Sequence, residues 1–520
     1  MHQIATDRII IVGAGLGALY AALCLAPRPV LLISPDALGV GASSAWAQGG
    51  VAAAMAQADS PQSHARDTIS AGAGTVDAQV AATVTEEARA HILKLTDFGT
   101  AFDRTADGGY VMSREAAHSF ARVVRVQGDQ AGAEIMRSLI EQIRATPSIQ
   151  VLEGVLASGL DTDNGSVTGV QVELARAEGS APVMLRGAGY LLAGGGSGGL
   201  YALTTNPARI RGQVIGMAAR AGAVIADAEF VQFHPTAIDC GEDPAPLATE
   251  ALRGEGAHLI NRDGERFMLA LHPDAELAPR DVVARAIFAQ TQAGMRPMLD
   301  TRAALGADVL RHFPAVAQAC ARNGIDPVTQ PIPVAAAAHY HMGGIATDAS
   351  GRASLGNLWV CGEASSTGLH GANRLASNGL LEALVFARIC AQDMLENCAD
   401  AAGGDVVLPD LPPGIQPDPA LVATLRQAMT DGVGVLRDAE GLARALTIIA
   451  RIEAAQPECA NLQNMTATAT LIAAAAFDRR ESRGAHCRTD YPATLPDAQR
   501  SFLTLADAMA LRRQSKEPQT

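Results

Sequence analysis

Residues 8–25 read RIIIVGAGLGALYAALCL, and this stretch decides the fold. Residues 8–12 form a nearly continuous apolar run, which is typical of a strand buried inside a parallel sheet. Gly13, Gly15 and Ala18 follow as a GxGxxA fingerprint that opens a helix. In such a unit the first glycine makes the turn, the second lets a pyrophosphate approach the backbone, and the small third residue lets the helix pack. The stretch therefore predicts a βαβ dinucleotide-binding unit.

The second strand of this unit is predicted at residues 30–33 (VLLI). An acidic residue that binds a ribose is expected where this strand ends. Ser34, Pro35 and Asp36 stand there instead. Asp36 in a shifted register, or a hydroxyl group, could take that role, and the sequence leaves both alternatives open.

A second informative stretch is LWVCGEASSTGLHGANRLASNGLLE, residues 358–382. We expect a strand, a polar loop, an N-cap at Ser377 or Asn378, and a helix over residues 379–391. A helix start directs backbone N–H groups and a positive dipole end toward one point, and Arg374 lies close by in the sequence. The stretch predicts an anion site; the alternative is an ordinary strand–loop–helix connection with a solvated arginine.

Composition excludes several classes of partner. The chain has 520 residues, enough for two or three domains, and a formal net charge of −14. Such an acidic protein is a poor partner for nucleic acid or an anionic membrane. Its eight cysteines include no CxxC pair, so we expect no metal site and a reducing, cytoplasmic compartment. The apolar run at residues 9–26 is not interpreted as a membrane span, because it contains the glycine fingerprint and prolines end it.

The order of patterns predicts an α/β fold with a Rossmann-like dinucleotide-binding domain, an inserted domain and a C-terminal helical domain. Strand-to-glycine patterns continue to residue 200, turns and short helices dominate from residue 234 to residue 341, and a proline-rich linker follows at 409–419. The predicted domain ranges are 1–227 and 342–412 for the dinucleotide-binding domain, 228–341 for the inserted domain, and 413–520 for the helical domain. Trp46, in the small-residue loop at 39–50, suggests that this loop is packed.

Arginine and histidine residues recur in the predicted inserted domain. They lie in the motifs QFHPT (232–236), TEALRGEG (249–256), PRD (279–281) and HYHMGG (339–344), and Arg374 adds another cation. A buried dicarboxylate needs several hydrogen-bonded cations, so this set suits a small dianion. Each histidine alone is equally well explained as a core residue, and Arg280 alone as part of a surface ion pair. The conjunction favours a site.

Six motifs, spread over nearly the whole chain, resemble the succinate dehydrogenase/fumarate reductase flavoprotein superfamily: HGANRLASN (370–378), QFHPT (232–236), TEALRGEG (249–256), RDVVARAI (280–287), HYHMGG (339–344) and SRGAH (482–486). Three features resemble its aspartate-oxidising branch. Ser43 stands where the respiratory members carry a flavin-linked histidine, which implies non-covalent FAD. Glu115, in SREAAHS (113–119), would pair with the substrate ammonium. The sequence TTNP (204–207) is similar to the same branch.

The resemblance implies that the Rossmann-like domain is a FAD-binding domain and that the inserted domain is an α+β capping domain. It also implies a reaction and a role for each site residue. The expected reaction is FAD-dependent oxidation of L-aspartate to iminoaspartate, with O2 (giving H2O2) or fumarate as electron acceptor, as the first step of de novo NAD biosynthesis. Arg280 would be the acid/base, with Glu250 and Arg253 as its proton relay. The substrate-binding residues would be Glu115, His234, Thr249, His339 and Arg374. The FAD-contact residues would be Gly13, Ala14, Gly15, Gly17, Ala18, Ser43, Ser44, Gln48, Gly49, Gly50, Glu363, Ser377 and Leu380.

Some alternatives remain at this stage. Arginine stays protonated at neutral pH, so Arg280 could instead only clamp a carboxylate and polarise the substrate. Arg211–Gly212–Gln213–Val214 replaces the family's TGDG motif, and His341 precedes Met342 where relatives carry a small or apolar residue. The nearest rival function is a soluble fumarate reductase or succinate dehydrogenase flavoprotein; another is a flavin subunit that docks onto an iron–sulfur partner. Quinolinate synthase, which consumes iminoaspartate, is a candidate partner.

Overall fold

The computed structural model describes residues 2–399 and 403–515. A five-stranded parallel sheet lies at its centre, in the order β18-β11-β2-β3-β7. Its strands are β2 (Ile9–Val12), β3 (Val30–Ser34), β7 (Ile149–Glu153), β11 (Gly189–Leu192) and β18 (Leu358–Val360). The fingerprint strand β2 is thus central, and β18, from the second informative stretch, pairs with β11 at the sheet edge. The α/β prediction is confirmed.

Alternate residues of β2 face different cores. Ile9 and Ile11 pack against the helices α1 (Leu16–Leu25), α3 (Ala78–Asp97), α4 (Ala131–Arg144) and α10 (Asn378–Asn397). Ile10 and Val12 face a second core that includes α5 (Gln213–Arg220) and the sheet β1-β10-β9-β8. That sheet consists of β1 (His2–Ala5), β8 (Val155–Asp163), β9 (Ser166–Leu174) and β10 (Val183–Arg186). Burial on both faces explains why the strand is apolar throughout.

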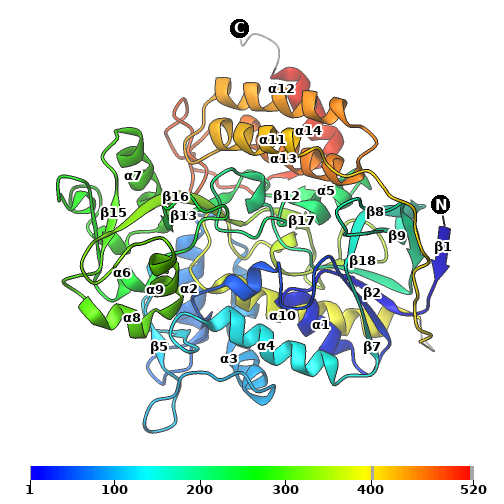
Figure 1. The fold of residues 1–520 in the computed structure, drawn as a ribbon, viewed down its shortest axis with the longest axis horizontal. Helices are drawn as coiled ribbons and strands as arrows, with labels where there is room; N and C mark the ends of the chain where they lie inside the picture. Colours follow the sequence, from blue (N-terminus) through cyan, green and yellow to red (C-terminus); the bar gives the residue numbers. More distant parts are fainter. Residues whose placement is uncertain (1, 400–402, 516–520) are drawn as a thin grey trace.

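A separate antiparallel sheet, in the order β13-β16-β15-β14, lies between residues 231 and 341. Its strands are β13 (Val231–Ile238), β14 (His258–Ile260), β15 (Met298–Asp300) and β16 (Ile332–His341). The helices α6 (Ala251–Gly254), α7 (Arg280–Gln292), α8 (Val309–His312) and α9 (Pro314–Arg322) accompany it, and this region has a core of its own. It occupies the green part of Figure 1. We refer to it as the cap; the domain boundaries given above stay predictions.

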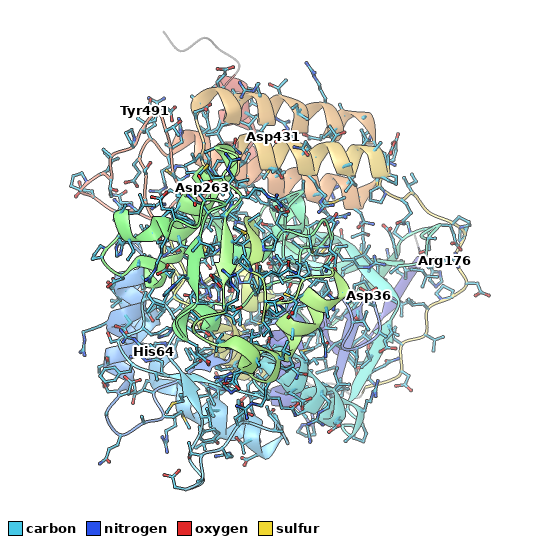
Figure 2. The ribbon with its side chains drawn as sticks, turned by 60° about the vertical axis from the view of Figure 1, so that its left-hand side comes forward. Asp36, His64, Arg176, Asp263, Asp431 and Tyr491 are labelled. Carbon is cyan, nitrogen blue, oxygen red and sulfur yellow. The ribbon has the colours of Figure 1, made fainter. Side chains whose placement is uncertain are left out.

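The C-terminal region is mainly helical. It contains α11 (Pro419–Gly432), α12 (Ala439–Ala455), α13 (Ala460–Asp478) and α14 (Leu505–Gln514), which form a layer at the top of Figure 1. Figure 2 shows Asp431 of α11 in this layer and His64 of α2 (Pro61–Ala71) away from it. Strand β20 (Phe502–Leu503) joins a small sheet with β12 (Ile225–Ala226), β17 (Gly344–Ala346) and β19 (Ser365–Ser366). A second small sheet contains β4 (Val51–Ala52), β5 (Met112–Ser113) and β6 (Val123–Val124).

Candidate active site

Two cavities meet between the parallel sheet and the cap. The larger has a volume of about 730 Å³ and follows the carboxyl ends of β2, β3, β11 and β18. The smaller, of about 80 Å³, lies where this cavity reaches the cap. Gln48, His339, Arg374 and Leu380 line both. A ligand in the larger cavity can therefore present one end to a small molecule in the smaller one.

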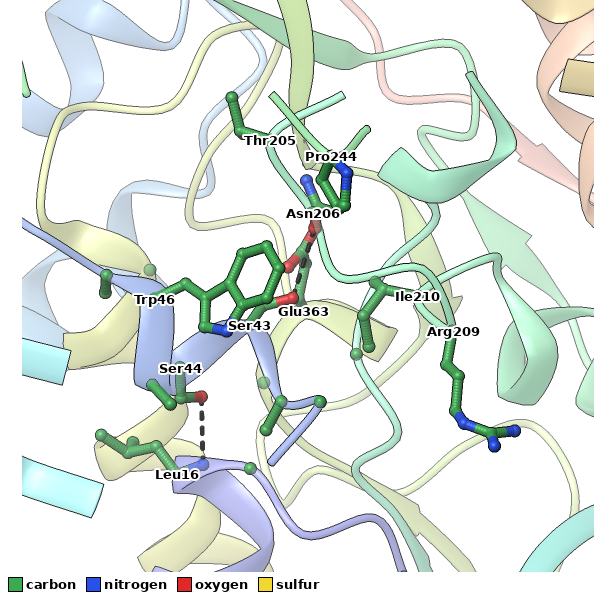
Figure 3. Close-up of a pocket in the computed structure, with 18 of the residues that line it drawn as sticks. Leu16, Ser43, Ser44, Trp46, Thr205, Asn206, Arg209, Ile210, Pro244 and Glu363 are labelled. Carbon is green, nitrogen blue, oxygen red and sulfur yellow. Dashed lines mark hydrogen bonds between the residues drawn. The ribbon is translucent and has the colours of Figure 1, made fainter. Parts of the chain in front are cut away.

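The fingerprint glycines make room at the start of α1. Gly13 has φ +124°, and a Cβ atom there would lie 2.3 Å from the main-chain oxygen of Ala193. Gly15 is the N-cap residue of α1 and provides no side-chain cap. The N–H of Leu16 donates to Ser44 Oγ at 3.1 Å (Figure 3). The helix start is thus open toward the cavity, as a pyrophosphate site requires.

The loop over this helix start is less packed than predicted. Ser43 to Trp46 form a 3-10 turn, and Ser43 Oγ donates to Asn206 at 3.3 Å. The Trp46 side chain lines the cavity but is 45% exposed, so the prediction of a packed loop is wrong for this residue. The indole ring lies over the cavity beside Ser43 and Asn206 in Figure 3, where solvent reaches its outer face.

Asp36 lines the large cavity beyond the end of β3 and pairs with Arg209 at 3.2 Å. Ser34 lines the same cavity, so both alternatives for the ribose contact stay predictions. Gln213, the first residue of α5, also lines this cavity, and its buried Oε1 has no hydrogen-bond partner among the described residues.

Buried polar atoms test whether this cavity fits FAD. Oε1 of Gln48 and Oε1 of Gln213 are both buried and unpartnered within the described chain, and each needs a donor. FAD carries ribose and ribityl hydroxyls and a ring N–H. Glu363 also lines the cavity, and burial raises the pKa of its carboxyl to about 7. Open glycines at a helix start together with unpartnered acceptors along the cavity fit FAD.

The smaller cavity brings together cations and histidines from distant elements. The predicted substrate residues Glu115, His234, Thr249, His339 and Arg374 all line it, as do Arg280 and Glu250. The rings of His234 and His339 pack edge to face with centroids 4.9 Å apart. Burial, followed by neighbouring charged groups, lowers the pKa of both histidines well below its usual value. Burial and the nearby Arg280 also lower the pKa of Arg374 to about 10.

Arg280, Glu250 and Arg253 form a buried chain of charges. Arg280 is the first residue of α7, and its Nε donates to Glu250 Oε2. Arg253 Nη2 lies 3.7 Å from the same carboxylate oxygen. Burial alone would raise the pKa of Glu250, but Arg280 and Arg253 hold it below its usual value. Arg253 does not line the small cavity; it lies behind Glu250.

Glu115 also lines the small cavity, and Ser377 Oγ donates to its Oε2 at 3.0 Å. Burial and the neighbouring Glu250 raise the pKa of Glu115 to about 7. Ser377 occupies the predicted N-cap position of α10, but its φ is +62° and its side chain does not cap the helix. The hydroxyl binds Glu115 instead, so the N-cap prediction is right in position and wrong in role. The helix continues to Asn397, past the predicted end at residue 391.

The remaining predicted cofactor residues divide between the cavities and the core. Gly13, Ala14, Gly15, Gly17, Ser43, Ser44 and Glu363 line the large cavity, and Gly49, Gly50 and Ser377 line the small one. Ala18 lines neither; it is fully buried in the packing of α1. His341 is a satisfied core histidine that contacts Ser197 and Ala228, which explains how the chain accommodates this departure from its relatives.

Sequence reasoning assigned no role to Gln232 or Tyr340. Gln232 Oε1 accepts from Arg280 Nη1 at 3.1 Å, and its amide donates to the main chain of Arg374. Tyr340 packs its ring 4.1 Å from the guanidinium carbon of Arg374. The period-2 pattern of β13, with Gln232 two residues before His234, was an available signal for the first. The loop histidine His370 bonds Glu382 and Tyr340 in the core.

Two further observations concern the described residues only. Within residues 2–399 and 403–515, no helix is long and apolar enough to cross a membrane. The same residues contain no group of three or more His, Cys, Asp or Glu side chains that could hold a metal ion.

Comparisons with known proteins agree with this geometry. The family model "FAD binding domain" matches residues 8–380, and "Fumarate reductase flavoprotein C-term" matches residues 454–518. The chain is 53% identical to L-aspartate oxidase of Caulobacter vibrioides over 97% of each chain. It is 46% identical to L-aspartate oxidase of Xylella fastidiosa, covering 97% of this chain and 96% of that one.

Solved structures show the same fold. An E. coli quinol fumarate reductase chain superposes with a TM-score of 0.86 at 28% identity, covering 96% of this chain and 93% of that one. A second quinol–fumarate reductase structure gives a TM-score of 0.85 at 27% identity, covering 97% and 98%. The chain is 46–53% identical to these oxidases over nearly its full length, and its larger cavity fits FAD. The chain is therefore an FAD flavoprotein and belongs to the L-aspartate oxidase family of the succinate dehydrogenase/fumarate reductase flavoprotein superfamily.

Proposed function

We propose that the protein oxidises L-aspartate to iminoaspartate, using FAD and either O2 or fumarate as electron acceptor. The observation that carries the proposal is the small cavity, in which a buried Glu115 faces Arg280, Arg374 and two histidines. The cations would bind the two carboxylates of any dicarboxylate, whereas the carboxylate of Glu115 would attract only a substrate that also carries an ammonium group. L-aspartate has both.

The residues of the small cavity bind and orient the substrate. Arg374, His234, His339 and Thr249 would hold the two carboxylates, because these are donors in a site that excludes water. Bound FAD would supply the hydride acceptor for the substrate carbon and would be reoxidised by O2, which gives H2O2, or by fumarate. The helix start of α10, beside Ser377, directs its positive dipole end toward this junction.

The role of Arg280 has two versions. In the first, Arg280 is the acid/base at the substrate carbon, and Glu250 and Arg253 relay protons to it. In the second, Arg280 clamps a carboxylate and polarises the substrate. Arginine side chains stay protonated at neutral pH, and Arg280 Nε donates to the Glu250 carboxylate. This supports proton donation or clamping more directly than proton abstraction.

We further propose that FAD is held without a covalent bond, because Ser43 offers a hydroxyl where a flavin-linked histidine would be needed. The reaction places the protein at the first step of de novo NAD biosynthesis in the cytoplasm. Quinolinate synthase, which consumes iminoaspartate, is the proposed partner. Co-purification of the two proteins tests this, and their independent elution at micromolar concentration contradicts it.

The proposed reaction is tested by a peroxide assay. Purified yellow protein receives L-aspartate in aerated buffer, with succinate and D-aspartate as matched controls. Peroxide with L-aspartate alone is the expected result. Dye reduction with succinate, without peroxide from L-aspartate, would overturn the proposal. It would favour the second candidate, a fumarate reductase or succinate dehydrogenase flavoprotein, which the similarity to quinol fumarate reductase structures supports.

A further inference from the structure

The turn at Thr204 to Asn206 holds His339 from two sides. Thr205 Oγ1 lies 2.8 Å from His339 Nδ1, and Asn206 Nδ2 donates to the main-chain oxygen of His339 at 2.8 Å. The N–H of Thr205 also donates to the main-chain oxygen of Ala338 at 3.0 Å. The turn follows β11, whereas His339 lies on strand β16 of the cap. Contacts across 134 residues of sequence thus fix both the ring and the backbone of His339.

The direction of the Thr205–His339 hydrogen bond follows from which atoms carry a proton and which acceptors lie within reach. Burial keeps the His339 ring neutral by lowering its pKa, and a neutral imidazole has one N–H and one bare nitrogen. The Thr205 hydroxyl belongs to a mostly buried residue that borders the larger cavity, and it makes no other hydrogen bond within the described chain. If it accepted from the ring, its own proton would have no acceptor among these residues, which is costly. Thr205 therefore donates to Nδ1, and the ring proton of His339 lies on Nε2.

The neighbouring His234 reaches the same state by a different route. The N–H of Thr236 lies 3.2 Å from His234 Nδ1 and can only donate. The Thr236 hydroxyl donates to the main-chain oxygen of Ala248 at 2.8 Å. His234 Nδ1 is therefore the bare nitrogen, and Nε2 carries the proton. The two packed rings share one tautomer.

We propose that Thr205 is a positioning residue that sets the tautomer of His339, so that both histidines of the dicarboxylate cavity donate from Nε2 while uncharged. The inference rests on the proposed function. Arg374, Arg280 and His234 are the charged or titratable groups that face His339. With two arginines already present, a neutral donor adds a hydrogen bond without a third buried positive charge. In the opposite tautomer a nitrogen lone pair would repel the carboxylate.

The first test compares Thr205→Val, which keeps the shape and removes the hydroxyl, with Thr205→Ser, which keeps the hydroxyl. Malonate, a dicarboxylate that the flavin cannot oxidise, is titrated into the FAD-loaded protein and followed by flavin absorbance. We expect Thr205→Val to raise the malonate Kd and the KM for L-aspartate about tenfold, the size of a lost hydrogen bond to a charged group, with little change in kcat. Thr205→Ser restores both. A malonate Kd within about twofold of the unchanged protein in Thr205→Val overturns the proposal.

Thr204→Val is the matched control, because the Thr204 hydroxyl bonds only main-chain groups of Ala338 and Asn206. It is expected to lower the Tm and leave the malonate Kd nearly unchanged. Equal weakening of malonate binding by both valine variants would assign the effect to the turn and overturn the proposal.

A direct measurement needs no variant at Thr205. Long-range ¹H–¹⁵N spectra of the FAD-loaded protein with ¹⁵N-histidine report which ring nitrogen carries the proton, and the spectrum of His339→Gln assigns the signals. A proton on Nε2 supports the proposal, and a proton on Nδ1 overturns it. Neither malonate binding nor the tautomer depends on oxidase activity, so failure of the proposed reaction is distinguishable from failure of this inference.

Discussion

At the scale of single residues, the site pairs unlike charges at close range. Glu115 and Glu250 are both buried, yet their environments push their pKa values apart. Arg280 and Arg253 outweigh burial at Glu250, whereas at Glu115 burial and the charge of Glu250 outweigh Arg280 and the Ser377 hydrogen bond. Such separation of two carboxyls assigns different tasks to chemically similar groups. Glu250 stays ionised beside Arg280, whereas Glu115 ionises close to neutral pH.

Glu115 should impose an acid limb on kcat/KM for L-aspartate. The carboxyl is protonated below its pKa of about 7 in the free protein, and a neutral carboxyl does not attract an ammonium group. We expect kcat/KM to fall about tenfold per pH unit below that value. Glu115→Gln should give a lower, flat profile between pH 6 and 8 while still binding malonate. An unchanged acid limb in the variant would assign the limb to another group.

Arg280→Lys should abolish hydride transfer and leave FAD bound. Lysine keeps a charge but loses the planar guanidinium that binds Glu250 and Gln232 together. We expect anaerobic flavin reduction by L-aspartate to slow at least 10²–10³-fold, as for other lost transition-state donors. Arg285→Lys, on the same helix and outside the cavity, is the control. Retention of most of the reduction rate in Arg280→Lys would remove the acid/base role.

At the scale of secondary-structure elements, helix α9 of the cap depends on another part of the chain for its N-cap. Its own N-cap residue, Phe313, has no capping side chain. Asp129, on the loop before α4, instead accepts from the N–H groups of Ala315 and Val316 at 3.0 and 3.1 Å. Arg125 on the same loop pairs with Glu255 of the cap at 3.0 Å. These contacts fasten the cap over the site.

Asp129→Ala should therefore loosen the cap. Loss of an N-cap costs about 1 kcal/mol, and here the lost contact is also one that holds the cap in place. We expect a severalfold higher KM for L-aspartate and faster limited proteolysis within the cap.

The control for this variant is Asp438→Ala, which removes the N-cap of α12 in the C-terminal region. It should lower the Tm to a similar extent without raising KM. Equal changes in KM for the two variants would contradict a fastening role for Asp129.

At the scale of the whole molecule, a buried ion network ties the C-terminal region to the entry of the cap. Arg479 pairs with Glu229, just before β13, and with Glu481, which also pairs with Arg483 at 3.0 Å. Arg483 donates to the main chain of Ala73 near the end of α2. One network thus spans three regions of the chain.

Glu481→Gln should destabilise the protein by about 3 kcal/mol, because the buried Arg483 loses its counter-charge and Arg479 loses one of its two. Burial raises the pKa of Glu481, but the hydrogen bond and charge of Arg483 and the other donors lower it more. Its contribution is thus present at neutral pH and lost as the pH falls through the lowered value. The Tm of the FAD-loaded protein measures the effect. Glu440→Gln, in an exposed pair with Arg444, is the control and should change little.

The sequence alone determined the α/β core, because continuous apolar strand runs and the glycine fingerprint are local properties of the chain. It also identified most residues that line the small cavity, since their motifs are specific to one family, but only a minority of those that line the large one. It did not place Trp46 correctly, because the exposure of a loop side chain depends on what packs across from it. Local spacing thus predicts where the strands lie and which residues belong to the site motifs.

Only the tertiary structure decided how these residues are held. Ser377 binds Glu115 across 262 residues instead of capping α10 with its side chain. Asp129 caps a helix 186 residues later, and Thr205 fixes His339. Side-chain pairs separated by hundreds of residues carry no periodic signal, because they exist only once the sheet, the cap and the helices have packed.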